Sequence, residues 1–141
     1  MITLELPFPP SVNHYWGTRI VGSGKRKLIQ RYIGEAGRKF RESVLETFLV
    51  ENVRTKLDGP IACTVDLYPP CNRRRDVDNY NKGLFDALGA AGLYQDDSQI
   101  IDLRIRMLPK QPPGKVVVTL REISEFEREG LQSDLLAEAA P

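Results

Sequence analysis

The sequence predicts an α+β fold in a single domain. Four segments alternate apolar and polar residues with a period of two, as half-buried strands do, and two others repeat apolar residues at helical spacing. In chain order they follow the pattern β-α-β-α-β-β, so we expect a four-stranded mixed sheet with the helices packed on it. The chain has 141 residues and a hydrophobic content of 41%, which suffices for one hydrophobic core.

The first strand is expected at residues 2–6, ITLEL, which alternate up to a proline. The next segment, PFPPSVNHYW at residues 7–16, contains three prolines. Because prolines remove backbone donors and restrict their neighbours, we expect an ordered loop at the edge of the sheet rather than regular structure.

A basic segment follows at residues 17–32, with five lysines and arginines around a Gly-Ser-Gly centre. Glycine and serine clusters of this kind favour a flexible loop or a loose hairpin. We expect this segment to be a phosphate-contacting arm, through Lys25, Arg26 and Lys27.

The first long helix is expected at residues 35–53, where apolar residues recur at helical spacing and charged residues, Arg41 among them, lie largely on the opposite, solvent side. Its expected buried residues are Ala36, Phe40, Val44, Leu45, Phe48 and Leu49. After an Asp-Gly-Pro turn, residues 61–68 alternate cleanly and predict the second strand. Its expected inward residues are Ile61, Cys63, Val65 and Leu67.

A shorter helix is expected at residues 78–91, with Gly92 as the left-handed stop and Asp76 or Asp78 as its N-cap. Its expected buried residues are Leu84, Phe85, Ala87, Leu88 and Ala91.

Two further strands are expected at residues 99–107 and 115–123, which alternate again. The PKQPPG loop between them predicts a hairpin. The inward residues expected in the third strand are Ile101, Leu103, Ile105 and Met107.

The net charge of +1 conceals an asymmetry along the chain. Residues 1–121 hold 19 basic and 13 acidic residues, whereas residues 122–141 hold one arginine and six acids. The basic body suits a polyanionic partner. The acidic tail at residues 124–141, expected to be helical or disordered, would repel that partner and is expected to lie away from the binding face.

Composition and motifs disfavour several other classes of protein. No apolar run approaches the roughly 18 residues of a membrane span, and the N-terminus starts with a strand pattern instead of a signal segment. Cys63 and Cys71 fit neither metal-ligand spacing nor a disulfide framework. We therefore expect a cytoplasmic protein with buried or incidental thiols and no membrane partner.

The segment with the most candidate catalytic residues is RRRDVDNYNKGLFDALGAAGLYQDDSQI, at residues 73–100. Asp76 and Asp78 are two residues apart where an extended segment becomes a helix, so both carboxylates could reach one ion. Asp96 and Asp97 follow the same helix. Four carboxylates near one another repel, and a hard divalent cation with oxygen ligands neutralises them most directly. The stretch therefore predicts a metal-dependent phosphodiester site.

A lysine accompanies these acids, since Lys82 lies one helical turn after Asp78. An ammonium group there could contact a scissile phosphate and stabilise its developing charge. Each feature alone also has a plain alternative, because one aspartate could cap the helix, Lys82 could form a surface ion pair, and Asp-Asp-Ser could be a turn. The combination favours the site, with Asp86 and Asp96 in supporting roles.

Arg73, Arg74 and Arg75 lead directly into the first acid. The planar guanidinium suits bidentate phosphate contact, so we expect at least one of them to bind the DNA backbone, although a solvated basic run is the alternative. His14, the only histidine, lies in the proline-rich loop. It offers no nucleophile scheme, and a structural or DNA-facing role is expected.

The sequence resembles the RusA-type Holliday junction resolvases, from LPFPPSVNHYW through RRRDVDNYNKGLFDAL and GLYQDDSQIID to the fourth strand. The spaced pattern D-x-D-N-x-x-K, then F-D-A-L, then G, then D-D-x-Q carries the resemblance. It implies a small homodimeric, magnesium-dependent endonuclease, of a kind often carried by phages and prophages, that resolves four-way DNA junctions by paired symmetric nicks. The tail after Ser124 extends beyond the family's usual end.

By the same resemblance, the catalytic residues are Asp76, Asp78, Asp97 and Lys82, with the three aspartates as Mg²⁺ ligands. Asp96 matches a neighbouring acid of the family. Two alternatives stay open: a catalytically inert DNA-binding dimer, and a metal-dependent phosphohydrolase acting on a small phosphoester. The intact set of three aspartates and a lysine disfavours the first, and the many basic residues disfavour the second.

Overall fold

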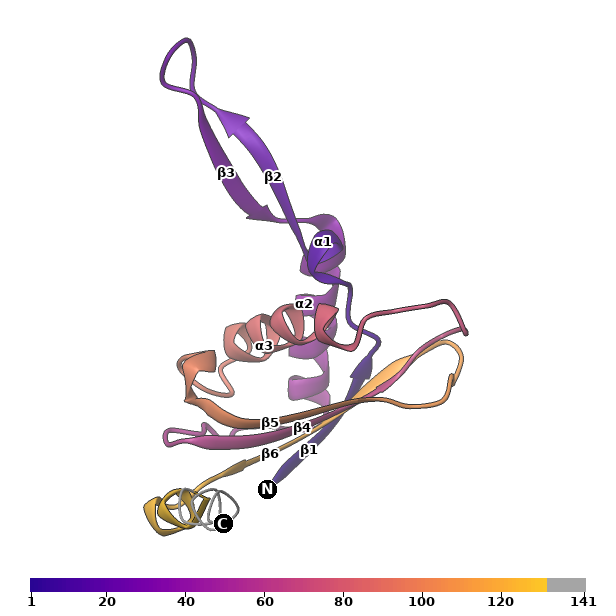
Figure 1. The fold of residues 1–141 in the computed structure, drawn as a ribbon, viewed down its shortest axis with the longest axis vertical. Coiled ribbons are helices and arrows are strands. Elements are labelled where there is room, and N and C mark those ends of the chain that lie inside the picture. The colour runs from indigo at the N-terminus through magenta and orange to yellow at the C-terminus, as the bar shows by residue number, and fades with distance from the viewer. Residues whose placement is uncertain (132–141) are drawn as a thin grey trace, which may run out of the picture.

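The computed structural model describes residues 1–131 and is built on a four-stranded mixed sheet (Figure 1). The sheet has the order β1-β6-β4-β5, and every neighbouring pair is antiparallel except β4 and β5, which are parallel. The strands are β1 (Ile2–Pro7), β4 (Ile61–Tyr68), β5 (Ile100–Met107) and β6 (Lys115–Glu122). The predicted α+β class and mixed sheet are confirmed.

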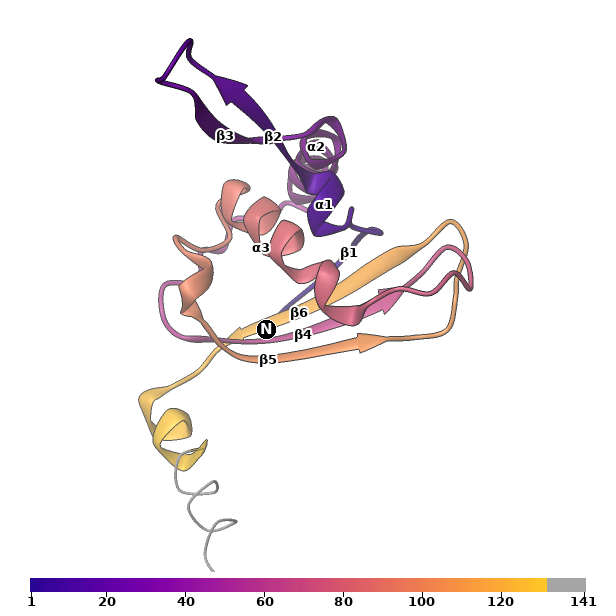
Figure 2. The same cartoon turned by 45° about the horizontal axis from the view of Figure 1, so that its top comes forward.

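The helices cover one face of this sheet (Figure 2). They are α1 (Val12–Tyr15), α2 (Glu35–Val50) and α3 (Asn81–Ala90), with short 3₁₀ helices at Val77–Asn79 and Asp97–Gln99. The core lies between the two layers. From the sheet it takes Leu4, Leu6, Ile61, Cys63, Val65, Leu67, Val116, Val118 and Leu120, and from α2 and α3 it takes Phe40, Val44, Phe48, Leu84, Phe85, Ala87 and Leu88.

The predicted hairpin between the last two strands is wrong, because β4 lies between β5 and β6. The chain passes from β4 through α3 into β5, and this crossover makes the two strands parallel. The loop at 108–114 then carries the chain past β4 to its other side. The alternation of apolar and polar residues identifies a strand but does not show which strands lie next to it. For this reason the sequence did not reveal that β4 separates β5 from β6.

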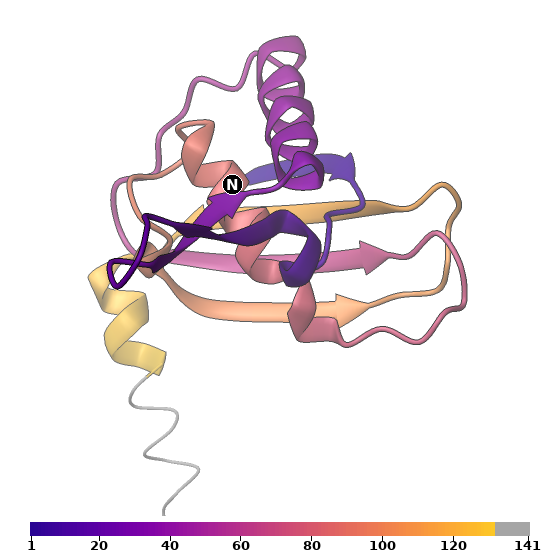
Figure 3. The ribbon, with the colours of Figure 1, turned by 90° about the horizontal axis from the view of Figure 1, so that it is seen from above.

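Helix α2 buries a narrower face than predicted and ends at Val50 instead of near residue 53. Leu45 is 49% exposed, Leu49 is 74% exposed, and Ala36 is exposed as well. Seen from above, α2 lies toward the β1 side of the sheet, so only part of its circumference has a neighbour (Figure 3).

We predict that two adjacent residues of α2 differ sharply in their contribution to stability. Phe48 is 5% exposed, and Phe48→Ala should lower the free energy of unfolding by about 3–5 kcal/mol. Leu49→Ala is the matched control and should change it by less than about 0.5 kcal/mol. Urea unfolding followed by circular dichroism measures both, and equal losses would contradict the position of α2.

Strand β5 is an edge strand, and its predicted burial is partly wrong. Leu103 pairs with the buried Cys63, so it does point to the core face, but it stays 39% exposed. Ile101 lies at an irregularity of the β4–β5 register and is 43% exposed. Ile105 and Met107 are half-buried. An edge strand has a neighbour on one side only, so inward residues remain accessible.

Residues 17–32, predicted as a flexible loop or loose hairpin, form a regular antiparallel hairpin that projects from the body (Figure 1). Its strands are β2 (Trp16–Val21) and β3 (Leu28–Ile33), and Lys25, Arg26 and Lys27 lie in the exposed turn at its tip. The proline-rich loop before it, predicted to lack regular structure, ends in the single-turn helix α1.

The chain continues after β6 into a helical segment at 125–131. Ser124 and Glu127 form a reciprocal capping box, in which each side chain accepts a hydrogen bond from the other's backbone N–H. Arg121 of β6 also contacts Glu127 at 3.1 Å. The tail therefore begins as a helix tied to β6, whereas the rest of the predicted tail, residues 132–141, lies outside the described residues. Within residues 1–131, no helix has the length and apolarity to cross a membrane.

Candidate active site

Asp76, Asp78 and Lys82 lie around the start of α3. Asp76 has an extended backbone, Asp78 follows inside the 3₁₀ helix at Val77–Asn79, and Lys82 belongs to the first turn of α3. The side chains of both aspartates and of Lys82 are exposed. The capping role predicted for Asp76 or Asp78 is wrong. Tyr80 is the residue that precedes α3, and no side chain makes a capping hydrogen bond at the start of α3 or of the 3₁₀ helix at Val77–Asn79. Both carboxylates therefore face solvent instead of closing a helix.

Asp96 and Asp97 follow the C-terminal end of α3, where Gly92, with φ at +90°, ends the helix as predicted. Asp96 is the N-cap of the 3₁₀ helix at Asp97–Gln99 and accepts a 2.9 Å hydrogen bond from the Ser98 N–H. Gln99 fixes this turn, because its side-chain oxygen accepts from the Asp96 N–H and its amide donates to the Leu57 carbonyl. Asp96 thus has a structural role, and it places Asp97 beside α3.

The charges around Asp97 connect it to α3. Burial raises its pKa most, followed by the hydrogen bond and negative charge of Asp96 and the charge of Asp86, while the positive charge of Lys82 opposes the rise. Lys82 therefore acts on Asp97 across the space between α3 and the following turn. This electrostatic effect links two of the predicted site residues, which lie at opposite ends of α3.

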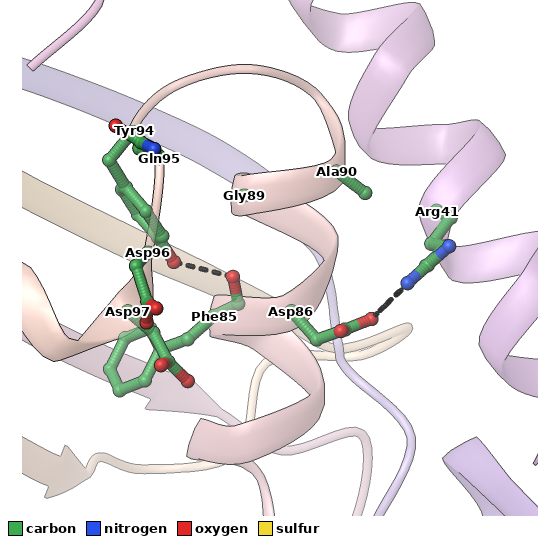
Figure 4. Close-up of a pocket in the computed structure, with 9 residues that line it drawn as sticks. All are labelled: Arg41, Phe85, Asp86, Gly89, Ala90, Tyr94, Gln95, Asp96 and Asp97. Atoms are coloured by element: carbon green, nitrogen blue, oxygen red, sulfur yellow. Dashed lines mark hydrogen bonds and ion pairs between the residues drawn. The ribbon is translucent and has the colours of Figure 1, made fainter.

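Asp97 borders a pocket of about 300 Å³. Asp86, Asp96 and Arg41 also line it, and the side chain of Asp86 points away from α3 toward Arg41 on α2 (Figure 4). Tyr94 forms part of its wall and donates a hydrogen bond to the Phe85 carbonyl of α3. The pocket thus combines three carboxylates with one guanidinium.

The structure does not gather the three predicted metal ligands into one cluster. Among residues 1–131, no three His, Cys, Asp or Glu side chains are arranged so that they could hold a metal ion. Asp76 and Asp78 precede α3 and Asp97 follows it. Their donor chemistry does fit Mg²⁺, since all three offer hard carboxylate oxygens. Their assignment as ligands therefore stays a prediction.

The three arginines before Asp76 differ in their surroundings. Arg75 is half-buried and holds its own loop together, donating hydrogen bonds to the carbonyls of Cys71 at 2.9 Å and Arg73 at 3.0 Å. Its guanidinium also lies over the Phe8 ring, 5.7 Å from the centroid. Arg73 and Arg74 are exposed and remain the better candidates for phosphate contact.

His14 has a local partner, because its Nδ1 atom lies 2.7 Å from the Ser11 hydroxyl. Both residues belong to the turn that leads into β2. This contact fits a structural role for His14, which was one of its two predicted roles. The other, contact with DNA, stays a prediction.

The most prominent group of polar contacts was missed by sequence reasoning. Tyr15, Arg41 and Asp86 come from α1, α2 and α3 and hydrogen-bond to one another, although Arg41 was placed on the solvent side of its helix. The only available signal was Asp86 itself, a charged residue between the buried Phe85 and Ala87.

We predict that the two thiols differ in reactivity. Arg75 donates a hydrogen bond to the exposed Cys71 and lowers its pKa, whereas burial raises the pKa of Cys63 to about 12. Because the thiolate is the reactive form, a disulfide reagent at neutral pH should modify one thiol in the native protein and two in urea. Modification of both thiols in the native state would contradict the burial of Cys63.

Carboxylates, a lysine and exposed arginines, together with a projecting basic hairpin, are features expected of a phosphodiester-cleaving protein. The family model described as endodeoxyribonuclease RusA matches residues 7–121. The chain therefore belongs to the RusA family of endodeoxyribonucleases, which confirms the resemblance of its motifs.

Relatives named crossover junction endodeoxyribonuclease RusA occur in phages and bacteria. The one from Enterobacteria phage HK97 is 37% identical over 120 residues, covering 84% of this chain and 92% of the relative. Those from Shigella sonnei (strain Ss046) and Escherichia coli (strain K12) are 30% and 29% identical over 121 residues, covering 86% of this chain and 94% of each relative.

Proposed function

We propose that this protein is a structure-selective endodeoxyribonuclease that resolves four-way DNA junctions by paired, symmetric nicks. The observation that carries the proposal is the family match, which spans residues 7–121 and so includes every residue of the proposed site. The relatives that carry the crossover junction name match over the same body of the chain. The proposed setting is DNA recombination and repair in a bacterial cell, with a phage or prophage as the proposed source.

Binding is assigned to the basic side chains on two elements. Lys25, Arg26 and Lys27 at the tip of the β2–β3 hairpin would contact phosphates far from the sheet, and Arg73 and Arg74 would contact them close to Asp76. A hairpin that projects from the body suits an extended polyanion better than a small phosphoester (Figure 1).

Catalysis is assigned to Asp76, Asp78, Asp97 and Lys82. The three aspartates would hold Mg²⁺, which when bound supplies Lewis acidity to the scissile phosphate. Lys82, whose charge reaches Asp97, would stabilise the negative charge that develops on the phosphate oxygens. A homodimer with two-fold symmetry would present two equivalent sites to opposed strands, as paired nicks require.

The test is a cleavage assay on fixed and mobile four-way junctions, forks and plain duplex, each with Mg²⁺ and with EDTA. We expect paired nicks in the junctions with Mg²⁺ and no cleavage with EDTA. Junction binding without cleavage would favour an inert binding protein, and equal cleavage of plain duplex would overturn the selectivity. Hydrolysis of p-nitrophenyl phosphate without junction cleavage would favour the small-phosphoester alternative.

A further inference from the structure

Three side chains from three helices meet beside the pocket in one hydrogen-bonded group, here called the Tyr15 network. The Tyr15 hydroxyl donates to Asp86. The Arg41 guanidinium donates to the Tyr15 oxygen at 2.9 Å and to the Asp86 carboxylate at 2.6 Å. Tyr15 is fully buried and the two charged side chains are about one-third exposed. A buried phenol and a half-buried charge pair are tolerated because each finds a partner here.

Tyr15 is also the residue from which the hairpin starts. It is the last residue of α1, and β2 begins at Trp16, whose ring lies 4.3 Å from that of Tyr15 between centroids. The Tyr15 carbonyl accepts a 2.8 Å hydrogen bond from the N–H of Gly34, the residue directly after β3. Both strands of the hairpin are thus anchored at Tyr15.

The same residue contacts the helices on either side of it at close range. A Cβ atom added at Gly83 of α3 would lie 2.8 Å from the Tyr15 ring, and one added at Gly37 of α2 would lie 2.4 Å from the Tyr15 carbonyl oxygen. Only glycine allows such approaches. Gly83 directly follows Lys82, and Asp86 lies one turn further along α3, so the network contacts the helix segment that carries the proposed catalytic lysine.

We propose that Tyr15, Arg41 and Asp86 are positioning residues that hold the β2–β3 hairpin in a fixed position relative to Lys82 on α3. This inference rests on the proposed function. The hairpin binds phosphates away from the body, whereas cleavage occurs beside α3, so a bound junction is cut only when both elements keep a fixed mutual position. A displacement of about 1 Å of the reacting groups can cost on the order of 100-fold in rate.

The network acts on the geometry of the bound substrate and not on the strength of binding. Its three side chains are engaged with one another, and the basic residues at the hairpin tip do not belong to it. Breaking it therefore leaves the phosphate contacts in place and allows the hairpin to shift relative to α3. The expected signature is a loss of cleavage rate at unchanged affinity.

Tyr15→Phe is the sharpest variant, because it removes one hydroxyl and keeps the ring that packs against Gly83 and Trp16. We expect its single-turnover cleavage of a saturated four-way junction to fall about 10- to 100-fold, with a junction Kd within about 2-fold of the wild-type value. Arg41→Met should lose a similar factor. The double variant should lose no more than the worse single variant, since groups that act as a unit are non-additive.

The control is Val118→Ala on β6, a buried core residue that takes no part in the hydrogen bonds of the network and whose truncation lowers stability. Its cleavage rate per folded molecule should match the wild type. Wild-type cleavage rates in both Tyr15→Phe and Arg41→Met, or equal losses in Val118→Ala, would overturn the positioning role while leaving the proposed function intact. Wild-type protein that cuts no junction would overturn the proposed function and the inference with it.

Discussion

Replacement of Asp97 by Asn is expected to abolish junction cleavage while leaving junction binding largely intact. The substitution keeps the size of the side chain but removes the negative charge that the positive charge of Lys82 stabilises. It also removes a proposed Mg²⁺ ligand. We expect the nicking rate on a fixed four-way junction to fall by at least about 100-fold, measured with Mg²⁺ under single-turnover conditions, and Asp76→Asn to behave alike.

Asp96→Asn provides the matched control for this prediction. Asp96 caps the 3₁₀ helix at Asp97–Gln99, and asparagine caps equally well. This variant should therefore retain most of the cleavage activity. Full cleavage by Asp97→Asn would remove that residue from the proposed catalytic set, and loss of junction binding in the same variant would assign it to substrate contact instead.

Neutralising the hairpin tip is expected to weaken binding to every junction sequence alike. Glutamine at Lys25, Arg26 and Lys27 removes up to three phosphate contacts. We expect the affinity at about 0.1 M salt to fall roughly 10- to 100-fold and the slope of log K against log salt to become shallower by as much as about 3. Fluorescence anisotropy of labelled junctions across a salt series measures both quantities.

A second triple substitution separates hairpin contact from general charge. Glutamine at Arg54, Lys56 and Lys110 changes the net charge by the same amount at exposed positions outside the hairpin and the arginine loop. It should leave affinity and salt slope nearly unchanged. Equal weakening by both triple variants, or no weakening by either, would remove the hairpin from the binding model.

Local patterns predicted the elements of the fold well and their neighbours poorly. The alternation of Ile61, Cys63, Val65 and Leu67 marks a strand with one buried face, and the structure buries all four. The same reasoning wrongly placed β5 beside β6, because nothing in the sequence indicates that β4 lies between these two strands. Burial of Leu49 was overestimated for a related reason, because helical spacing does not define how wide a face the neighbouring elements cover.

The site shows the same division between local and distant effects. The turn that was the plain alternative for Asp-Asp-Ser is present, because the Asp96 carboxylate accepts a hydrogen bond from a residue two positions away. The Tyr15 network could not be predicted, since its hydrogen bonds join residues 71 and 45 positions apart and depend on how α1, α2 and α3 pack. No local sequence pattern predicts such packing. In this structure it places Arg41 against Tyr15 and Asp86 instead of on the expected solvent side of α2.

The central claim, that this protein makes paired cuts at four-way junctions, is tested most directly on a supercoiled plasmid with an extruded cruciform. Two coordinated nicks across the junction convert the circle to a linear product, whereas single nicks leave an open circle. We predict that linear product appears with Mg²⁺ from the first turnover and depends on the cruciform. Open circles alone, or equal cutting of a plasmid without the cruciform, would contradict it.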